Sequence, residues 1–201
     1  MSDNPIFTLA ARSRSCRRFD ASRPISRETL LSLIECARMA PTGANRQPLR
    51  FYPITDSAVK ETLFPQLHWA MALPDWAGPE AEERPTAYIV ILADTRLAPA
   101  ERVSMDVGIA AQTIALAAAA EQLGLCMLGA FKKEDVHTLL QLPEHLLPVL
   151  ILALGYPAET PVLCDVPENG DVRYFRTPDG IHHVPKRSLQ ALLYEPEKPA
   201  L

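Results

Sequence analysis

The chain has 201 residues, of which 48% are hydrophobic and 22% are charged, as is usual for a folded globular protein. Its net charge of −4 argues against a general nucleic-acid-binding protein. No apolar run is long enough for a membrane-spanning helix, no signal peptide is visible, and the four widely spaced cysteines fit reduced thiols, so we expect a cytoplasmic protein that needs no membrane.

The first predicted elements are two helices. Residues 5–11 are expected to form a short helix that precedes a basic segment. A second helix starts after Ser26, which can cap it, while Ile25 and Leu30 occupy the positions of a hydrophobic staple. This helix should end before Pro41, because proline disfavours the helical conformation of the residue that precedes it.

The middle of the chain predicts two strands. Residues 49–54 fit a strand, and Pro53 places it at a sheet edge or a strand end. A short helix over 57–64 leads into the proline-rich segment 65–85, which we expect to be an irregular excursion from the core. Its two tryptophans fit either local core or stacking on a substrate. Residues 87–93 are apolar on both faces, which predicts a central strand.

The strongest helix prediction covers Asp106–Leu123, with Gly124 as the glycine that ends it. Seven alanines and little charge predict that this helix is buried. A strand over 125–129, a helix over 133–141 and a buried strand over 149–154 are expected to follow.

The C-terminal part predicts a hairpin and a helix. Strands over 172–175 and 181–184 should flank a turn at 178–180, and 186–194 fits a terminal helix. Helices and strands do not alternate strictly, so the sequence predicts a single α+β domain over 1–201, with a central, mostly antiparallel sheet flanked by helices.

Candidate chemical groups lie mainly in the N-terminal quarter, where residues 1–50 hold nine arginines against four acidic residues. Arg14, Ser15 and Arg17 could converge on one phosphate, because guanidinium groups bind phosphate through two hydrogen bonds. Cys16, between arginines, could have a lowered pKa, although a buried, inert thiol is the simpler interpretation.

A second polar segment, 41–48, could present backbone amides to a flat heterocycle, or it could be an ordinary turn between helix and strand. The sequence contains no GxGxxG, GxxxxGK[ST] or GxSxG motif. Its histidines and cysteines lack the spacings of a metal site, so no metal is expected.

Together these segments resemble the nitroreductase family of FMN-dependent oxidoreductases. The resemblance is carried by RSRSCRRF and ECARMAPTGANRQPLRFY, then by DVGIAAQTIALAAAAEQLGLCMLGAF, VLILALGYPAE and VPKRSL, in the expected order over nearly the whole chain. It implies an interlocked homodimer with FMN at the subunit interface. Ser13 stands where the family has the first arginine of a pair, so we expect weaker phosphate binding.

The resemblance also implies a role for each matching residue. The FMN phosphate and ribityl end would be held by Arg14, Ser15 and Arg17, with Lys186 and Arg187. The flavin ring would be approached from the other subunit by Pro41, Thr42, Gly43 and Asn45, and lined by Leu128 and Gly129. No residue is assigned a catalytic role, because the flavin carries the chemistry.

The implied activity is electron transfer from NADH or NADPH, through FMN, to a small electrophilic acceptor such as a nitroaromatic or a quinone, by a ping-pong mechanism. Three alternatives stay open. One is another flavin reaction on the same scaffold, such as reductive dehalogenation or dehydrogenation. The second is a non-catalytic FMN-binding carrier or sensor. The third is a non-flavin protein whose arginine-rich turn binds an acidic partner.

Overall fold

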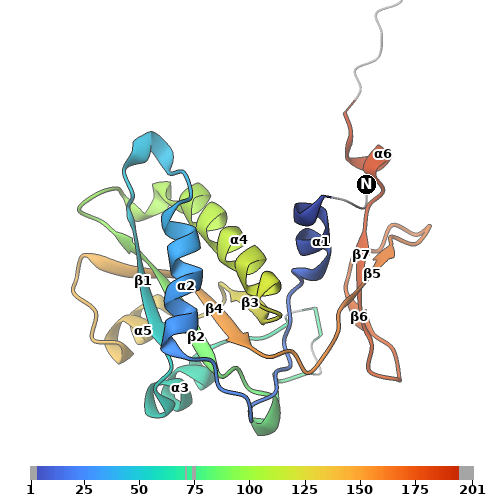
Figure 1. The fold of residues 1–201 in the computed structure, drawn as a ribbon, viewed down its shortest axis with the longest axis horizontal. Coiled ribbons are helices and arrows are strands. Elements are labelled where there is room, and N and C mark those ends of the chain that lie inside the picture. Colours follow the sequence, from blue (N-terminus) through green and yellow to red (C-terminus); the bar gives the residue numbers. More distant parts are fainter. Residues whose placement is uncertain (1–3, 71, 74–75, 195–201) are drawn as a thin grey trace, which may run out of the picture. The chain divides into compact units, whose positions relative to one another are not determined.

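A computed structural model describes residues 4–70, 72–73 and 76–194. The chain divides into two compact units, Met1–Glu159 and Thr160–Leu201 (Figure 1). None of the helices within the described residues combines the length and the apolar character needed to cross a membrane. The same part of the chain has no group of three or more His, Cys, Asp or Glu residues arranged to hold a metal ion.

The first unit is built on a four-stranded sheet of order β1-β2-β4-β3, in which all neighbours are antiparallel. Its strands are β1 (Leu49–Ile54), β2 (Ala87–Asp94), β3 (Gly124–Leu128) and β4 (Leu146–Gly155). β1 lies at the edge and carries Pro53, as predicted. β2 is buried along its whole length, as expected of a central strand. The predicted α+β fold with a central antiparallel sheet is confirmed.

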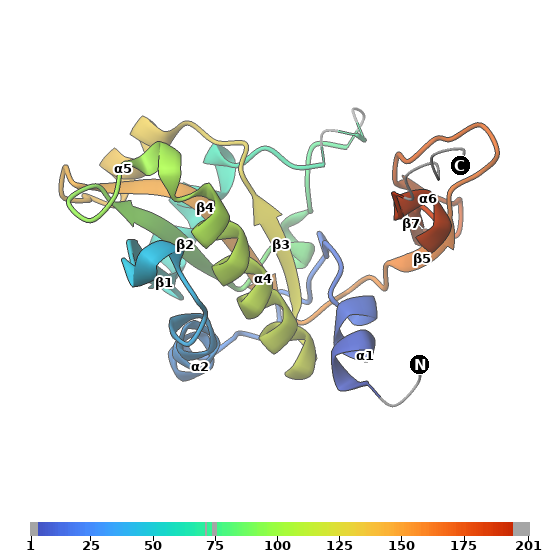
Figure 2. The ribbon, with the colours of Figure 1, turned by 90° about the horizontal axis from the view of Figure 1, so that it is seen from above.

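Helices cover both faces of this sheet. They are α2 (Arg27–Arg38), α3 (Ser57–Leu63), α4 (Ser104–Ala120) and α5 (Lys133–Leu139), while α1 (Pro5–Arg12) contacts α4 and buries none of its residues. α2 and α4 lie side by side over one face (Figure 2), where Ile89 and Ile91 of β2 join their core. Tyr88 and Val90 point to the opposite face and pack with α3 and α5. Because side chains alternate along a strand, the sheet separates two hydrophobic cores.

The start of α2 follows its sequence signals. The Ser26 hydroxyl accepts a hydrogen bond from the backbone N–H of Thr29 (3.1 Å). Ile25 and Leu30, the predicted staple pair, are both buried. The helix ends at Arg38, before Pro41, as predicted.

The end of α4 differs from its prediction. The helix stops at Ala120, and Gln122 rather than Gly124 adopts the left-handed conformation that follows it (φ 59°). Gly124 instead begins β3, where a Cβ atom would lie 2.7 Å from the Sγ of Cys16. The assignment of Gly124 as the helix-ending glycine is therefore wrong: the glycine is needed for close packing against the N-terminal segment.

Part of the predicted excursion over 65–85 belongs to the core. Its described residues include short 3₁₀ turns at Phe64–Gln66 and Ala81–Glu83 but no strand. Trp69 is buried among core residues and lies 5.9 Å, between ring centroids, from Phe64. This favours the core interpretation of Trp69. Pro74, which we also assigned to the excursion, lies outside the described residues.

The second unit contains a small sheet of order β5-β7-β6. Its elements are β5 (Val162–Asp165), β6 (Phe175–Arg176), β7 (His182–Lys186) and the short helix α6 (Leu189–Leu192). β6 and β7 form the predicted hairpin, although β6 begins at Phe175 rather than residue 172. β5 was not predicted, and it pairs with β7 in parallel. In this unit the sheet is therefore mixed.

Candidate functional site

The basic segment after α1 runs along β3. Ser15 forms a parallel bridge with Leu125, and the N–H of Cys16 donates to the carbonyl oxygen of Leu125 (3.0 Å). These backbone contacts fix the path of the segment against the sheet. The predicted phosphate ligands of the first unit, Arg14, Ser15 and Arg17, are therefore held beside β3.

Arg14 has hydrogen-bonding capacity to spare. Its Nη2 donates to the carbonyl oxygen of Ala10 at the end of α1 (2.5 Å). Its Nε is buried and has no hydrogen-bond acceptor among the described residues. Leaving a buried donor of a charged group without an acceptor costs free energy, which an anionic ligand would recover.

A carboxylate lies beside the same segment. The backbone N–H of Arg17 donates to the Oε1 of Glu159 (2.6 Å). No local sequence signal identifies Glu159, because it lies 142 residues from its partner in the chain. The backbone N–H of Arg17 is thus already hydrogen-bonded to Glu159. Any contribution of Arg17 to anion binding would come from its guanidinium group.

Cys16 is an inert thiol. It is buried, and burial, reinforced by the negative charge of Glu159, raises its pKa to about 12. The suggestion that flanking arginines lower this pKa is wrong, because loss of hydration outweighs their attraction for the thiolate. Burial likewise raises the pKa of Cys126 to about 11.

The far end of β3 carries the next predicted site residues. Leu128 is buried, whereas Gly129, just after the strand, is exposed. Leu128 lies three residues beyond Leu125, or about 10 Å along the strand at its usual rise per residue. The N–H of His68 donates to the carbonyl oxygen of Ala130 (3.0 Å), so the segment before Trp69 borders this end of the strand.

The loop between α2 and β1 has a constrained backbone. Ala44, Asn45 and Gln47 all have positive φ values, between 48° and 53°. Residues other than glycine rarely adopt this backbone region, and asparagine is among those that tolerate it best. The N–H of Gln47 donates to the Thr42 hydroxyl (3.1 Å), which closes the loop. The N–H of Ala44 has no acceptor among the described residues and stays available to a ligand.

Two buried aspartates fasten this loop to the rest of the unit. The Oδ1 of Asp106, in the first turn of α4, accepts a hydrogen bond from the N–H of Gly43 (2.9 Å). At the exit, the N–H of Asp94 donates to the carbonyl oxygen of Pro48 (2.8 Å). Hydrogen bonds from Arg96 lower the pKa of Asp94 to about 2, so its carboxylate is charged at neutral pH. The sequence placed Asp106 only at the start of the long helix, and we predicted no role in the site for either aspartate.

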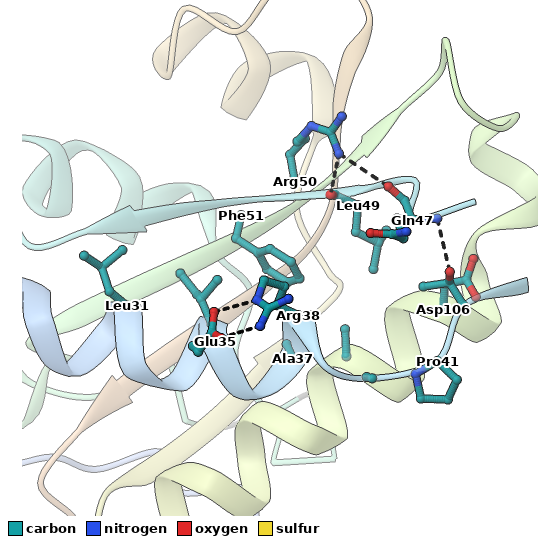
Figure 3. A pocket seen from close by; sticks show the side chains of 14 residues that line it. Leu31, Glu35, Ala37, Arg38, Pro41, Gln47, Leu49, Arg50, Phe51 and Asp106 are labelled. Atoms are coloured by element: carbon teal, nitrogen blue, oxygen red, sulfur yellow. Dashed lines mark hydrogen bonds and ion pairs between the residues drawn. The ribbon is translucent and has the colours of Figure 1, made fainter. Parts of the chain in front are cut away.

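A cavity of about 490 Å³ opens between α2, this loop, β1 and α4 (Figure 3). Its walls combine apolar side chains such as Leu31 and Phe51 with polar ones. Glu35 and Arg38 form a two-bond ion pair at its rim (2.6 and 2.7 Å). In Figure 3 the carboxylate of Asp106 points from α4 toward the loop. Pro41 and Thr42 line this cavity, so two of the predicted ring-contacting residues border it.

The remaining predicted ligands lie in the second unit. Lys186 is the last residue of β7, and Arg187 follows it; both are exposed. The carbonyl oxygen of Lys186 accepts a hydrogen bond from the N–H of Val166 (3.1 Å), which fixes the backbone at this position. Their side chains are accessible to a ligand.

Comparison with known proteins agrees with this fold. The sequence profile of the nitroreductase family matches residues 10–156. An oxygen-insensitive NADPH nitroreductase of Salmonella typhimurium is 31% identical over 169 residues, which cover 80% of this chain and 69% of that protein. An iodotyrosine deiodinase of Haliscomenobacter hydrossis is 28% identical over 179 residues, with 76% and 79% covered. The solved structure of NfrA1 from B. megaterium is 27% identical, with a TM-score of 0.64 and coverage of 82% and 72%.

The four-stranded antiparallel sheet, with helices on both faces and a basic segment along β3, defines an α+β protein of the nitroreductase fold. The matched residues span well over half of the chain. The chain belongs to the nitroreductase family, and the relationship inferred from its sequence motifs is confirmed.

Proposed function

We propose that this protein passes electrons from NADH or NADPH, through bound FMN, to a small electrophilic acceptor of the nitroaromatic or quinone type. Its family and relatives make it a flavin-dependent NAD(P)H oxidoreductase. FMN would supply the redox chemistry, accepting a hydride from the nicotinamide and then reducing the acceptor in the same pocket. The two half-reactions would give ping-pong kinetics.

The observation that carries this proposal is the basic segment along β3. Arg14, with its unsatisfied buried Nε, would hold the FMN phosphate together with Ser15 and Arg17. Lys186 and Arg187 would add positive charge to the same phosphate. A guanidinium group offers its donors in a plane that matches phosphate oxygens, which explains the preference for arginine here.

The ring would lie at the far end of β3. Leu128 and Gly129 would line it, and the loop carrying Pro41, Thr42, Gly43 and Asn45 would approach it from a second copy of the chain. The unpaired N–H of Ala44 suits an oxygen or nitrogen atom of the ring. Donors of this kind would stabilise the negative charge of reduced flavin.

A homodimer is part of the same proposal. α4 buries one face, yet Met105 at its start is 76% exposed and Leu116 is only half-buried. The small alanine side chains on this helix would let a second copy approach closely. Exposed apolar residues of α6, Leu189 and Leu192 among them, are further surface that association would cover.

Gly129→Ala tests the position of the ring. A Cβ atom at Gly129 would meet only the Cδ1 of Leu150, at 4.0 Å, which is an ordinary contact. The variant should therefore fold normally but bind FMN about tenfold more weakly, because an extra methyl group in a closely packed contact costs on the order of 1–3 kcal/mol. Titration of FMN against the apoprotein measures this, and unchanged affinity would place the ring elsewhere.

The proposed activity is tested by the absorption spectrum of the purified protein before and after anaerobic NADH and NADPH. Flavin bands that bleach with either nucleotide support the oxidoreductase. Bands that never bleach identify a flavin carrier or sensor instead. A colourless protein that also refuses added FMN contradicts the phosphate site and the function built on it.

Reductive dehalogenation is the second candidate, because a relative of similar coverage is named an iodotyrosine deiodinase. Both reactions use the same flavin and differ in the acceptor. Steady-state rates with a nitroaromatic, a quinone and a halophenol separate them. A rate with the halophenol that exceeds the other two would replace the first proposal by the second.

A further inference from the structure

Asp106 is the contact that ties the proposed flavin loop to the long helix α4. The residue is 8% exposed, and its Oδ1 accepts a hydrogen bond from the N–H of Gly43 at 2.9 Å. Within the described residues, this is the only hydrogen bond formed by its carboxylate. Gly43 is 63 residues away in the chain, so the contact joins two distant segments.

The segment held in this way is the strained part of the loop. Ala44, Asn45 and Gln47 have positive φ values directly after Gly43. Two further hydrogen bonds, both to Thr42, keep the turn closed. The N–H of Asn45 donates to the carbonyl oxygen of Thr42 (2.9 Å), and the N–H of Gln47 donates to the Thr42 hydroxyl (3.1 Å). Strained backbone of this kind persists only when its surroundings over-determine it.

Asp106 and Thr42 therefore act together. Thr42 closes the loop on itself, whereas Asp106 fixes the closed loop in space against α4. Asp106 lines the cavity in Figure 3 and also a second cavity, of about 200 Å³, which it forms with loop residues and with Ala98 and Arg102. The loop borders two cavities, so hydrogen bonds contribute much of what holds it: Asp106 holds its start at Gly43, and the backbone N–H of Asp94 holds its end at Pro48.

We infer that Asp106 is a positioning residue that presets the 41–47 loop, including the free N–H of Ala44, for contact with the flavin ring. This inference rests on the proposed function, because it gives the loop its ligand. The hydrogen bond of the carboxylate goes to the loop, so its effect on the flavin would be indirect.

The test compares Asp106→Ala with Asp106→Asn and with Asp135→Ala in the full-length protein. Asparagine keeps a carbonyl oxygen at the position of Oδ1. Asp135 is the matched control, because it is the third residue of α5, as Asp106 is of α4, and no hydrogen bond to its side chain is present in the described residues. It reports the loss of a favourable charge from a helix N-terminus alone.

Two readouts are needed. Amide hydrogen exchange in the apoprotein reports whether the loop is fastened, and FMN titration reports whether this matters for the flavin. We expect Asp106→Ala to speed exchange at Gly43 and to weaken FMN binding, each about tenfold, as for the loss of one hydrogen bond to a charged group. Asp106→Asn should stay within about threefold of wild type, since a neutral acceptor gives a weaker bond. Asp135→Ala should match wild type.

Three outcomes overturn the inference. Unchanged exchange at Gly43 in Asp106→Ala would mean that the loop is held by other contacts. Faster exchange with unchanged FMN affinity would mean that the loop does not serve the flavin, while the proposed function would stand. Equal losses of FMN affinity in Asp106→Ala and Asp135→Ala would mean that the effect comes from the missing charge at a helix N-terminus and not from the contact with the loop. If wild type binds no FMN, the proposed function fails with the inference, and exchange at Gly43 still reports the fastening itself.

Discussion

Replacement of Arg14 by alanine should weaken FMN binding by roughly 10- to 100-fold, the loss expected for a hydrogen-bonded charged group. The guanidinium group offers a buried Nε that has no acceptor among the described residues. A bound phosphate would accept a hydrogen bond from this Nε, which is already removed from water. Fluorescence titration of FMN against the apoprotein measures the change.

Riboflavin separates the phosphate contact from general damage to the fold. Riboflavin lacks the phosphate, so its affinity should be nearly the same for wild type and Arg14→Ala. Arg12→Ala is the matched control, because Arg12 is an exposed arginine two residues away at the end of α1. Equal weakening of FMN and riboflavin binding by Arg14→Ala would instead assign to Arg14 a structural role through its bond to Ala10.

The elements of the first unit follow closely from local signals. Strand 49–54 was predicted with its observed bounds, and of the two positions that Pro53 indicated, a sheet edge or a strand end, the structure shows the edge. The start of α2 was predicted from Ser26 and its hydrophobic staple, because a cap acts on residues three or four positions away. The phosphate-binding candidates were likewise predicted because arginine is dense over a short stretch.

The contacts that shape the candidate site are long-range and left no local signal. The bond from Gly43 to Asp106 spans 63 residues, and that from Arg17 to Glu159 spans 142. In the loop after α2, the positive φ values fall on residues other than its glycine, such as Ala44. Tertiary hydrogen bonds impose that conformation, so residue preferences could not predict it.

Short strands, such as those in the second unit, are also hard to predict from sequence. β5 has four residues with no alternation of buried and exposed side chains, so periodicity could not identify it. Its parallel pairing with β7 depends on a partner 21 residues away in sequence, Val162 opposite His183. Gly124 was misassigned for a related reason, since a glycine after a helix and a glycine at a close crossing look alike in sequence.

We expect Gly155→Ala to cause the largest loss of stability, because the N-terminal segment passes very close to this glycine. Gly155 pairs with Gly124 across β4 and β3, and the N-terminal segment passes over this pair. A Cβ atom at Gly155 would lie 2.8 Å from the Cβ and Cδ1 of Phe19. Phe19 is fully buried, and its N–H donates to the carbonyl oxygen of Glu83 (2.9 Å), so it has little room to move. Overpacking of this kind typically costs about 1–3 kcal/mol of the free energy of unfolding.

Urea unfolding followed by circular dichroism measures this cost, and Gly108→Ala is the matched control. Gly108 lies on the exposed side of α4, and a Cβ there would meet nothing within 4 Å. It should stabilise the protein by up to about 1 kcal/mol, because alanine favours a helix over glycine. Gly155→Ala should also weaken FMN binding, because a displaced Phe19 shifts Arg14 and Arg17 along β3. Stability within about 0.5 kcal/mol of wild type, the usual range of a harmless surface change, would mean that the segment can move away and that this crossing does not fix the site.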